Sequence, residues 1–209
     1  MATILFVCTG NICRSPIAEA FLRHLLAARR IDGISIESAG VAGWEDSAAA
    51  PEAIEALREL AIDLSPHQAR RLSRSLIERA DLVLAMAAEH RDATIRLAPS
   101  AGPRTFTLKE LVDLLRQADG VSATRDTQGE PAARLKALVG EADRLRASGV
   151  ERSIDEDVAD PLGTGVESFR ATAWEIEALC QQLVDLLFGP SRGEHRPQRA
   201  EVERGGRTR

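Results

Sequence analysis

The chain has 209 residues, enough to bury the core of a single domain. Its composition, 44% hydrophobic and 28% charged, is ordinary for a globular protein. The formal net charge of -5 offers no electrostatic basis for binding nucleic acid or an acidic membrane surface, so neither is expected as a partner.

The cysteines and the N-terminus bear on where the protein works. The apolar run 4–7 lacks a basic flank and is too short to span a bilayer, so we expect no signal peptide. An odd number of cysteines without an export signal predicts free thiols in a reducing cytoplasm. The spacing of Cys8, Cys13 and Cys180 does not match a zinc site, and no metal or cofactor is expected.

Strands and helices alternate through the first half of the chain. Residues 3–7 predict a buried strand, and Ser15 with Pro16 is typical of an N-cap followed by a first-turn proline. Further along, the patterns predict strands at 34–38, 82–86 and 104–107, and helices at 51–60, 88–97 and 108–116. This alternation predicts an α/β domain with a central four-stranded parallel sheet and helices on both faces.

The second half of the chain has a different character. Residues 117–155 are polar and rich in charge around one amphipathic stretch, 132–146, which we interpret as a helix inserted between flexible joints. A long helix is predicted at 168–188, with Gly189 and Pro190 ending it. We therefore expect one domain, 1–188, and a disordered Arg-rich tail, 189–209.

Residues 8–15 read Cys-Thr-Gly-Asn-Ile-Cys-Arg-Ser between a predicted strand and a predicted helix. In that setting backbone N–H groups converge and the helix dipole adds positive potential, which suits a phosphate dianion. The nucleotide-type Gly-Lys-Ser/Thr ending is absent. The expected phosphate-binding residues are Thr9, Gly10, Asn11, Ile12, Cys13, Arg14 and Ser15.

Three side chains of this loop have the chemistry of phosphoryl transfer. The Cys8 thiol becomes a nucleophile when ionised, and the converging N–H donors favour that form. Arg14 can hold two phosphoryl oxygens in a bidentate fork. Ser15 can donate to the Cys8 sulfur and ease its departure. Parallel sheets with helices on both faces bind ligands at the carboxyl ends of their strands, and Cys8 stands at the end of the first predicted strand.

Residues 7–19, Val-Cys-Thr-Gly-Asn-Ile-Cys-Arg-Ser-Pro-Ile-Ala-Glu, resemble the signature of the low-molecular-weight protein tyrosine phosphatase family. Residues 37–40, 63–70, 82–86 and 160–161 also resemble family segments. The resemblance implies a flavodoxin-like, three-layer fold and a cysteine-dependent phosphomonoester hydrolase that forms a phosphocysteine and needs no cofactor. The implied partner is a phosphorylated protein substrate, with phosphotyrosine as the phosphorylated residue.

Two-step phosphoryl transfer through Cys8 needs an acid that protonates the leaving oxygen and a base that afterwards activates water, and one carboxylate can do both. Residue chemistry alone leaves Asp155, Glu156, Asp157 and Asp160 open. The resemblance favours Asp160, which Pro161 follows in a turn, with Asp157 second.

The resemblance also implies roles around the loop. Ser38 and His67 match positions that hydrogen-bond Asn11 and brace the loop. For His67 the alternative is a purely structural histidine, which would look the same in sequence. Trp44 matches an aromatic wall beside the substrate, with a packing residue as the alternative, and Ile12 would also face the substrate.

Cys13 can approach Cys8 across the loop, and in the family such a pair forms a protective disulfide. The alternative for Cys13 is a small buried hydrophobe, and Cys180 is expected to be buried and inert. The chain departs from the family in having Ala87 where Asp is usual, and Leu162 where an aromatic residue often follows. The insertion 117–155 could supply other walls.

Three other functions stay open. An arsenate reductase of the same fold needs a relay of thiols, and no cysteine pair lies in 82–97. Phosphoarginine phosphatases resemble this chain but tend to carry Thr where Ile12 stands. A phosphoprotein-binding module without turnover is disfavoured by the intact Cys8, Arg14 and Asp160.

Overall fold

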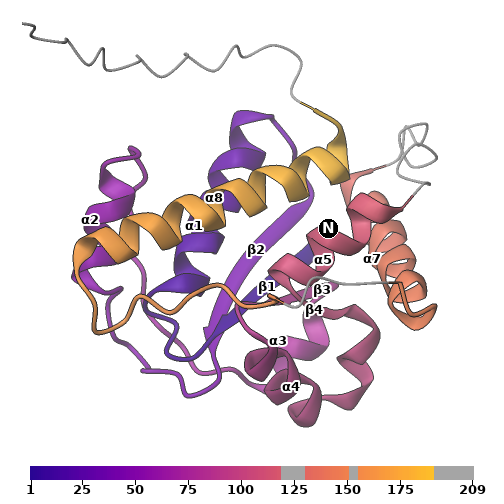
Figure 1. The fold of residues 1–209 in the computed structure, drawn as a ribbon, viewed down its shortest axis with the longest axis horizontal. Helices are drawn as coiled ribbons and strands as arrows, with labels where there is room; N and C mark the ends of the chain where they lie inside the picture. The colour runs from indigo at the N-terminus through magenta and orange to yellow at the C-terminus, as the bar shows by residue number, and fades with distance from the viewer. Residues whose placement is uncertain (119–129, 151–154, 191–209) are drawn as a thin grey trace, which may run out of the picture.

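A computed structural model describes residues 1–118, 130–150 and 155–190 of the chain. Four strands alternate with helices along it (Figure 1). The strands are β1 (Ala2–Cys8), β2 (Ile34–Gly40), β3 (Leu82–Ala85) and β4 (Thr105–Thr107). The helices are α1 (Arg14–Ala28), α2 (Pro51–Arg58), α3 (Arg74–Arg79), α4 (Ala88–Leu97), the 3-10 helix η1 (Pro99–Arg104), α5 (Leu108–Gln117), α7 (Pro131–Ala147) and α8 (Val166–Phe188).

The four strands form one parallel sheet in the order β2-β1-β3-β4. The α/β architecture predicted from the alternation is therefore confirmed. The register pairs Cys8 with Gly40 and Val7 with Ala85, so the carboxyl ends of the three strands meet at one edge. Parallel sheets of this kind hold their ligands at that edge.

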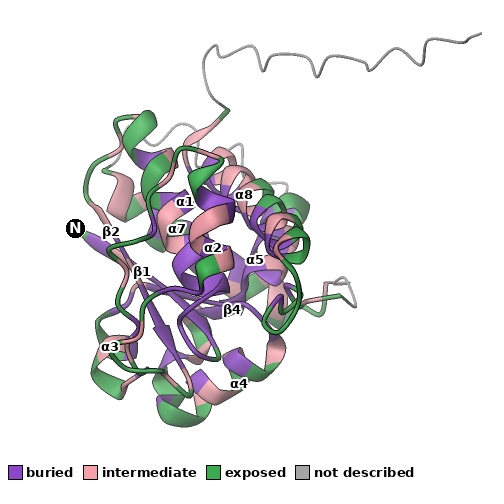
Figure 2. Ribbon diagram, turned by 90° about the vertical axis from the view of Figure 1, so that its left-hand side faces the viewer, coloured by how far each residue is buried: buried purple, intermediate pink, exposed green. Residues whose placement is uncertain are grey.

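Helices cover both faces of the sheet, and successive β1 side chains enter opposite cores. Ile4 and Phe6 belong to the larger core, with α1, α5, α7 and α8. Leu5 and Val7 belong to a smaller core, with α3 and η1. In Figure 2 the sheet is almost entirely buried, while the helices are exposed on their outer sides. Burial on both faces explains why β1 is a continuous apolar run rather than an alternating one.

Helix α1 corrects one prediction from the sequence. Ser15 is not its N-cap, because the helix begins at Arg14 and Cys13 occupies the cap position without a side-chain cap bond. The Ser15 hydroxyl is instead turned toward the loop, where it lies 3.0 Å from Cys8 Sγ. The Ser15 hydroxyl therefore contacts the loop and does not cap the helix.

Two helical segments have no counterpart in the predictions. Helix α3 is only six residues long and begins behind Ser73, whose Oγ accepts a hydrogen bond from the Leu76 amide. The segment η1 contains Pro99 and Pro103, which read as loop residues in sequence. Both are too short to show a helical period.

The inserted helix is present as α7, and it packs against α5, η1 and α8. Arg146 attaches it to the β4 edge by donating to Thr105 O at 2.8 Å and stacking over the Phe106 ring at 4.1 Å. The described part of the insertion thus covers the β4 edge and does not form the substrate wall that the sequence allowed. Much of the predicted joints on either side of this helix, residues 119–129 and 151–154, and the tail beyond Pro190 lie outside the described residues. Within the described ranges, no helix combines the length and apolarity required to cross a membrane.

Candidate active site

The loop 8–13 connects the end of β1 to the start of α1, and the segment after β2 follows it closely. Val41 N donates to Cys8 O at 2.9 Å, and Trp44 N donates to Gly10 O at 3.2 Å. Gly40 comes so close that a Cβ there would lie 2.6 Å from Thr9 O. Glycine at this position is what permits the two backbones to touch.

The Cys8 sulfur lies at the bottom of this loop and is buried. Asn11 N donates to Cys8 Sγ at 3.3 Å, and Ser15 Oγ lies 3.0 Å from the same atom. Helix α1 begins at Arg14, six residues further along the chain. The Asn11 amide donates to this sulfur, the Ser15 hydroxyl is within hydrogen-bond distance of it, and the helix N-terminus adds positive potential at the loop. The arrangement can therefore support a nucleophilic thiolate.

Asn11 organises the loop from within. Its φ of 58° is left-handed, a conformation that asparagine tolerates better than most residues. Its side-chain amide donates to Ser15 Oγ at 2.9 Å and to Ser38 Oγ at 2.8 Å, and its Oδ1 accepts from Arg70 N at 2.9 Å. Each side-chain polar atom of this buried residue is thus paired.

A second layer of side chains surrounds Asn11. His67 Nε2 lies 2.7 Å from Asn11 O, and the Ser38 hydroxyl donates to Glu19 Oε2 at 2.5 Å. A pocket of about 400 Å³ opens on the outer side of this layer, lined in part by Glu19, Ser38, His67 and Arg70. The pocket therefore lies behind the loop and not above Cys8. Ser38 and His67 both make the contact with Asn11 that the sequence predicted, and their bracing role stays a prediction.

Arg14 is held at three points. Its Nη1 donates to Val158 O at 3.1 Å, and its Nη2 lies 3.3 Å from Thr9 Oγ1 and 2.6 Å from Asp160 Oδ2. The Arg14 side chain is only 5% exposed, whereas that of Asp160 is 45% exposed. The arginine is therefore fixed in the wall of the site, and the carboxylate stands at its entrance.

The four carboxylates that residue chemistry alone left open have different partners. Asp157 Oδ1 accepts from Ala88 N at 2.8 Å and so caps α4. Glu156 accepts from Arg91 at 2.6 Å, and Asp155 accepts from Lys109 at 3.0 Å. Of the four, Asp160 is the one that the structure brings to Arg14. Asp157, the second candidate, instead accepts the hydrogen bond at the N-terminus of α4.

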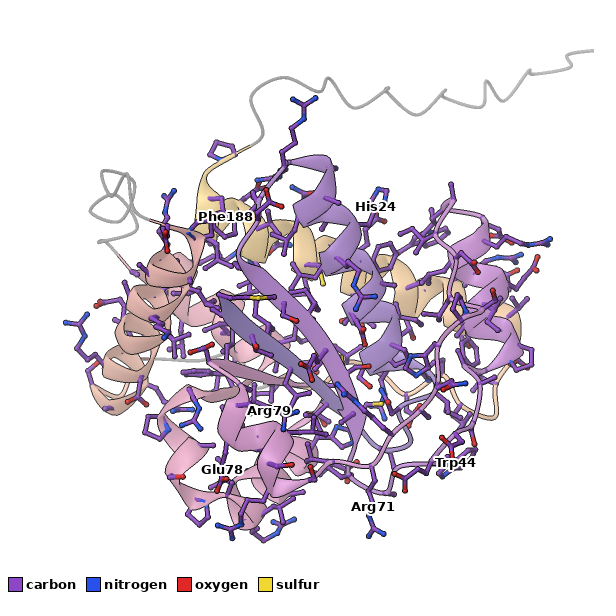
Figure 3. The ribbon with its side chains drawn as sticks, turned by 180° about the vertical axis from the view of Figure 1, so that it is seen from behind. His24, Trp44, Arg71, Glu78, Arg79 and Phe188 are labelled. Atoms are coloured by element: carbon purple, nitrogen blue, oxygen red, sulfur yellow. The ribbon has the colours of Figure 1, made fainter. Side chains whose placement is uncertain are left out.

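Apolar side chains stand around the mouth of the loop. Trp44 is 50% exposed, and its ring lies 3.7 Å from where a Cβ on Gly10 would be. Ile12 is buried within the loop, and its Cγ1 lies 3.4 Å from the same position. Figure 3 shows Trp44 and Arg71 on neighbouring loops at the same end of the sheet. Leu162, two residues after Asp160, is also exposed.

The three cysteines are all free thiols. Burial, with a further contribution from Cys8, raises the pKa of Cys13 to about 12. Cys180 is fully buried in α8, and burial raises its pKa strongly. Its burial is as predicted, and its inertness stays a prediction.

One residue near the loop was missed entirely. His90, in the first turn of α4, is buried with its Nε2 2.9 Å from Thr9 Oγ1. A lone histidine among polar helix residues carries no sequence signal for such a contact. In the part of the chain that the structure describes, no group of three or more His, Cys, Asp or Glu side chains is arranged to hold a metal ion.

Comparison with known proteins agrees with this geometry. The family model for "Low molecular weight phosphotyrosine protein phosphatase" matches residues 3–122. A protein-arginine-phosphatase from Geobacillus stearothermophilus is 33% identical over 184 residues, covering 88% of this chain and 95% of the relative. A probable low molecular weight protein-tyrosine-phosphatase, EpsP of Ralstonia solanacearum, is 41% identical over 109 residues, covering 52% of this chain and 72% of the relative.

Solved structures give the same two groups. The YwlE arginine phosphatase from Geobacillus stearothermophilus superposes with a TM-score of 0.65 at 32% identity, covering 90% of this chain and 93% of that one. A low molecular weight protein tyrosine phosphatase from T. tengcongensis also has a TM-score of 0.65 at 32% identity, covering 88% of this chain and 99% of that one.

Proposed function

The chain belongs to the low molecular weight phosphotyrosine protein phosphatase family and is a cysteine-dependent phosphomonoester hydrolase, and on that premise we propose that it acts on phosphotyrosine in proteins. The observation that carries the catalytic part is the convergence of Asn11 N and Ser15 Oγ on Cys8 Sγ. The observation that carries the substrate part is the apolar pair Ile12 and Trp44, which both lie close to Gly10.

In the first proposed step, the Cys8 thiolate attacks phosphorus and forms the S–P bond of a phosphocysteine. The bond from phosphorus to the leaving oxygen breaks, and that oxygen takes its proton from the Asp160 carboxyl group. Arg14 and the loop amides stabilise the charge on the equatorial phosphoryl oxygens. The position of Asp160 at the entrance, 2.6 Å from Arg14, supports this role.

In the second proposed step, water attacks the phosphocysteine. The Asp160 carboxylate accepts a proton from that water, the S–P bond breaks, and inorganic phosphate forms. The Ser15 hydroxyl, 3.0 Å from the sulfur, donates to the departing thiolate. This step restores the protonation states with which the cycle began. The remaining loop residues bind phosphate through their backbone amides, and Ser38 and His67 brace Asn11.

Relatives that are arginine phosphatases make phosphoarginine the second candidate substrate. A guanidino group carries several N–H donors that need acceptors, and an isoleucine side chain has none. A phenyl ring needs only apolar contact, which Ile12 and the half-exposed Trp44 ring offer. These two side chains therefore favour phosphotyrosine. This agrees with the sequence comparison, because phosphoarginine phosphatases tend to carry Thr where this chain has Ile12.

The test compares a phosphotyrosine peptide with a phosphoarginine peptide of the same sequence, with a metal chelator present. We expect the wild type to prefer phosphotyrosine, Cys8→Ser to abolish turnover, and Asp160→Asn to lower kcat by about 10²–10⁴-fold, the usual contribution of a general acid. Ile12→Thr should shift the kcat/KM ratio toward phosphoarginine, with Ile12→Val as the matched control. Faster hydrolysis of phosphoarginine by the wild type would reverse the assignment. Binding of vanadate without turnover would favour a phosphoprotein-binding module.

Three further features complete the proposal. We propose that Cys13 protects an oxidised Cys8 by forming a disulfide, and that the protein works in a reducing cytoplasm, which its free thiols suit. We also propose that residues 1–188 form one domain, which contains an insertion at about 117–155. The tail 189–209 follows this domain. The continuous core that joins α7 and α8 to the sheet supports the single domain.

A further inference from the structure

We propose that His90 is a positioning residue that fixes the Thr9 hydroxyl as a hydrogen-bond donor to the phosphoryl group. This inference rests on the proposed phosphatase mechanism and adds to it a residue from outside the phosphate-binding loop. Its basis is a chain of contacts that runs from α4 through the loop to the catalytic arginine.

The chain of contacts has three members. His90 Nε2 lies 2.9 Å from Thr9 Oγ1, and Thr9 Oγ1 lies 3.3 Å from Arg14 Nη2. His90 is only 1% exposed, so its ring is held in place and its contact with Thr9 is shielded from water. The α4 N-terminus that carries it is itself fixed, because Asp157 accepts from Ala88 N.

The hydrogens in this chain can be assigned from the chemistry of each group. A guanidinium group only donates, so Thr9 Oγ1 accepts from Arg14. The carboxylate of Glu89 lies 3.4 Å from His90 Nε2 and favours a proton on that nitrogen. In the part of the chain described here, His90 Nδ1 is buried without a partner, and an unpaired lone pair costs less than an unpaired N–H. Nε2–H therefore donates to Thr9.

The consequence concerns the Thr9 hydroxyl. With one lone pair of Oγ1 taken by Arg14 and the other by His90, its single hydrogen must point elsewhere. Arg14 binds the phosphoryl oxygens in the proposed mechanism and touches Thr9, so this hydrogen is available to the same oxygens. Thr9 then contributes a side-chain donor to the phosphate cradle, in addition to its backbone.

The burial of His90 and the nearby Arg14 favour a neutral imidazole. Burial, followed by the neighbouring guanidinium of Arg14, lowers the pKa of His90, while Glu89, Asp160 and Asp157 act in the opposite direction. A neutral ring with its hydrogen on Nε2 donates to Thr9 without placing a second cation beside Arg14. His67 differs, because it contacts a backbone carbonyl of the loop and not a side chain that reaches Arg14.

The first test is a double-mutant cycle on the full chain with para-nitrophenyl phosphate, together with inhibition by inorganic phosphate. We expect His90→Leu and Thr9→Val each to lower kcat/KM about tenfold, the size of one hydrogen bond, and to weaken phosphate inhibition. The double variant should lose no more than either single variant, because both remove the same donor. His90→Gln, whose side-chain amide can still donate, and Thr9→Ser, which keeps the hydroxyl, should both retain most of the activity.

The controls separate this inference from the proposed function and from folding. His24→Leu, on the exposed side of α1 (Figure 3), should leave all constants unchanged. A wild type without turnover would overturn the phosphatase mechanism itself. Additive losses in the double variant, with a wild type that turns over, would overturn the role of His90 alone.

The second test does not need turnover. In a ¹⁵N-histidine-labelled chain, the NMR shifts of the His90 ring nitrogens should report a neutral ring protonated at Nε2 at pH 7. The four histidines can be assigned with single-residue variants. A ring protonated at Nδ1 would mean that Thr9 donates to His90, and the proposal would then be wrong.

Discussion

Replacing Gly40 by alanine tests the contact between the end of β2 and the phosphate-binding loop. A Cβ at this position would lie 2.6 Å from Thr9 O, and 2.8 Å from both Asn11 N and Gly10 C. All three are backbone atoms, so no side chain can rotate away. An ordinary contact begins at 3.4 Å, so the loop would have to move by about 0.8 Å.

The expected magnitudes follow from that displacement. Overpacking of this kind costs about 1–3 kcal/mol of unfolding free energy, which in a chain of this size lowers Tm by roughly 2–4 °C for each kcal/mol. Misplacing catalytic groups by about 1 Å can cost about 10²-fold in rate, so kcat should fall about 10–100-fold. Calorimetry and hydrolysis of para-nitrophenyl phosphate measure the two effects.

The matched control is Gly140→Ala in α7. Gly140 is an exposed residue in a helix interior, and a Cβ there would meet nothing within 4 Å. Alanine should raise the unfolding free energy by roughly 0.5–1 kcal/mol and leave kcat unchanged. The two substitutions thus have opposite expected signs. A Gly40→Ala variant as stable and as active as the wild type would refute the argument from close contact.

Three more predictions concern single side chains. Asn11→Ala should lower the unfolding free energy by about 2–4 kcal/mol in urea titration, because it strands buried partners and leaves alanine at a φ of 58°. After peroxide treatment, a thiol reductant should restore the activity of the wild type but not that of Cys13→Ser. The disulfide should also form faster as the pH rises toward the Cys13 pKa of about 12, because more of the thiol is then ionised. A rate of disulfide formation that does not depend on pH would contradict this. Below pH ~6.5 the unfolded state should bind a proton that buried His90 resists, so Tm should fall more steeply with decreasing pH in the wild type than in His90→Gln; parallel curves would be the contrary result.

Much of the fold could be predicted because its information is local. The parallel sheet and the main helices follow from hydrophobic period and from the position of strand and helix signals, and the bounds of α4 were predicted without error. The short segments α3 and η1 were missed because six residues cannot show a period. Ser15 was wrongly predicted as an N-cap, although its contact with Cys8 was predicted correctly, because a serine before a first-turn proline looks the same in sequence whether or not it caps the helix.

The sequence by itself determined the loop that carries the chemistry, since residues 8–15 are contiguous and their order fixes the strand, the turn and the helix N-terminus. Only the tertiary structure decided which distant side chains meet that loop. It brought Asp160, which the resemblance had favoured, to Arg14, and it brought His90 to Thr9 across 81 positions of sequence. The reason is physical: contacts between segments depend on how parallel strands align at one edge of the sheet, and no local pattern records that alignment.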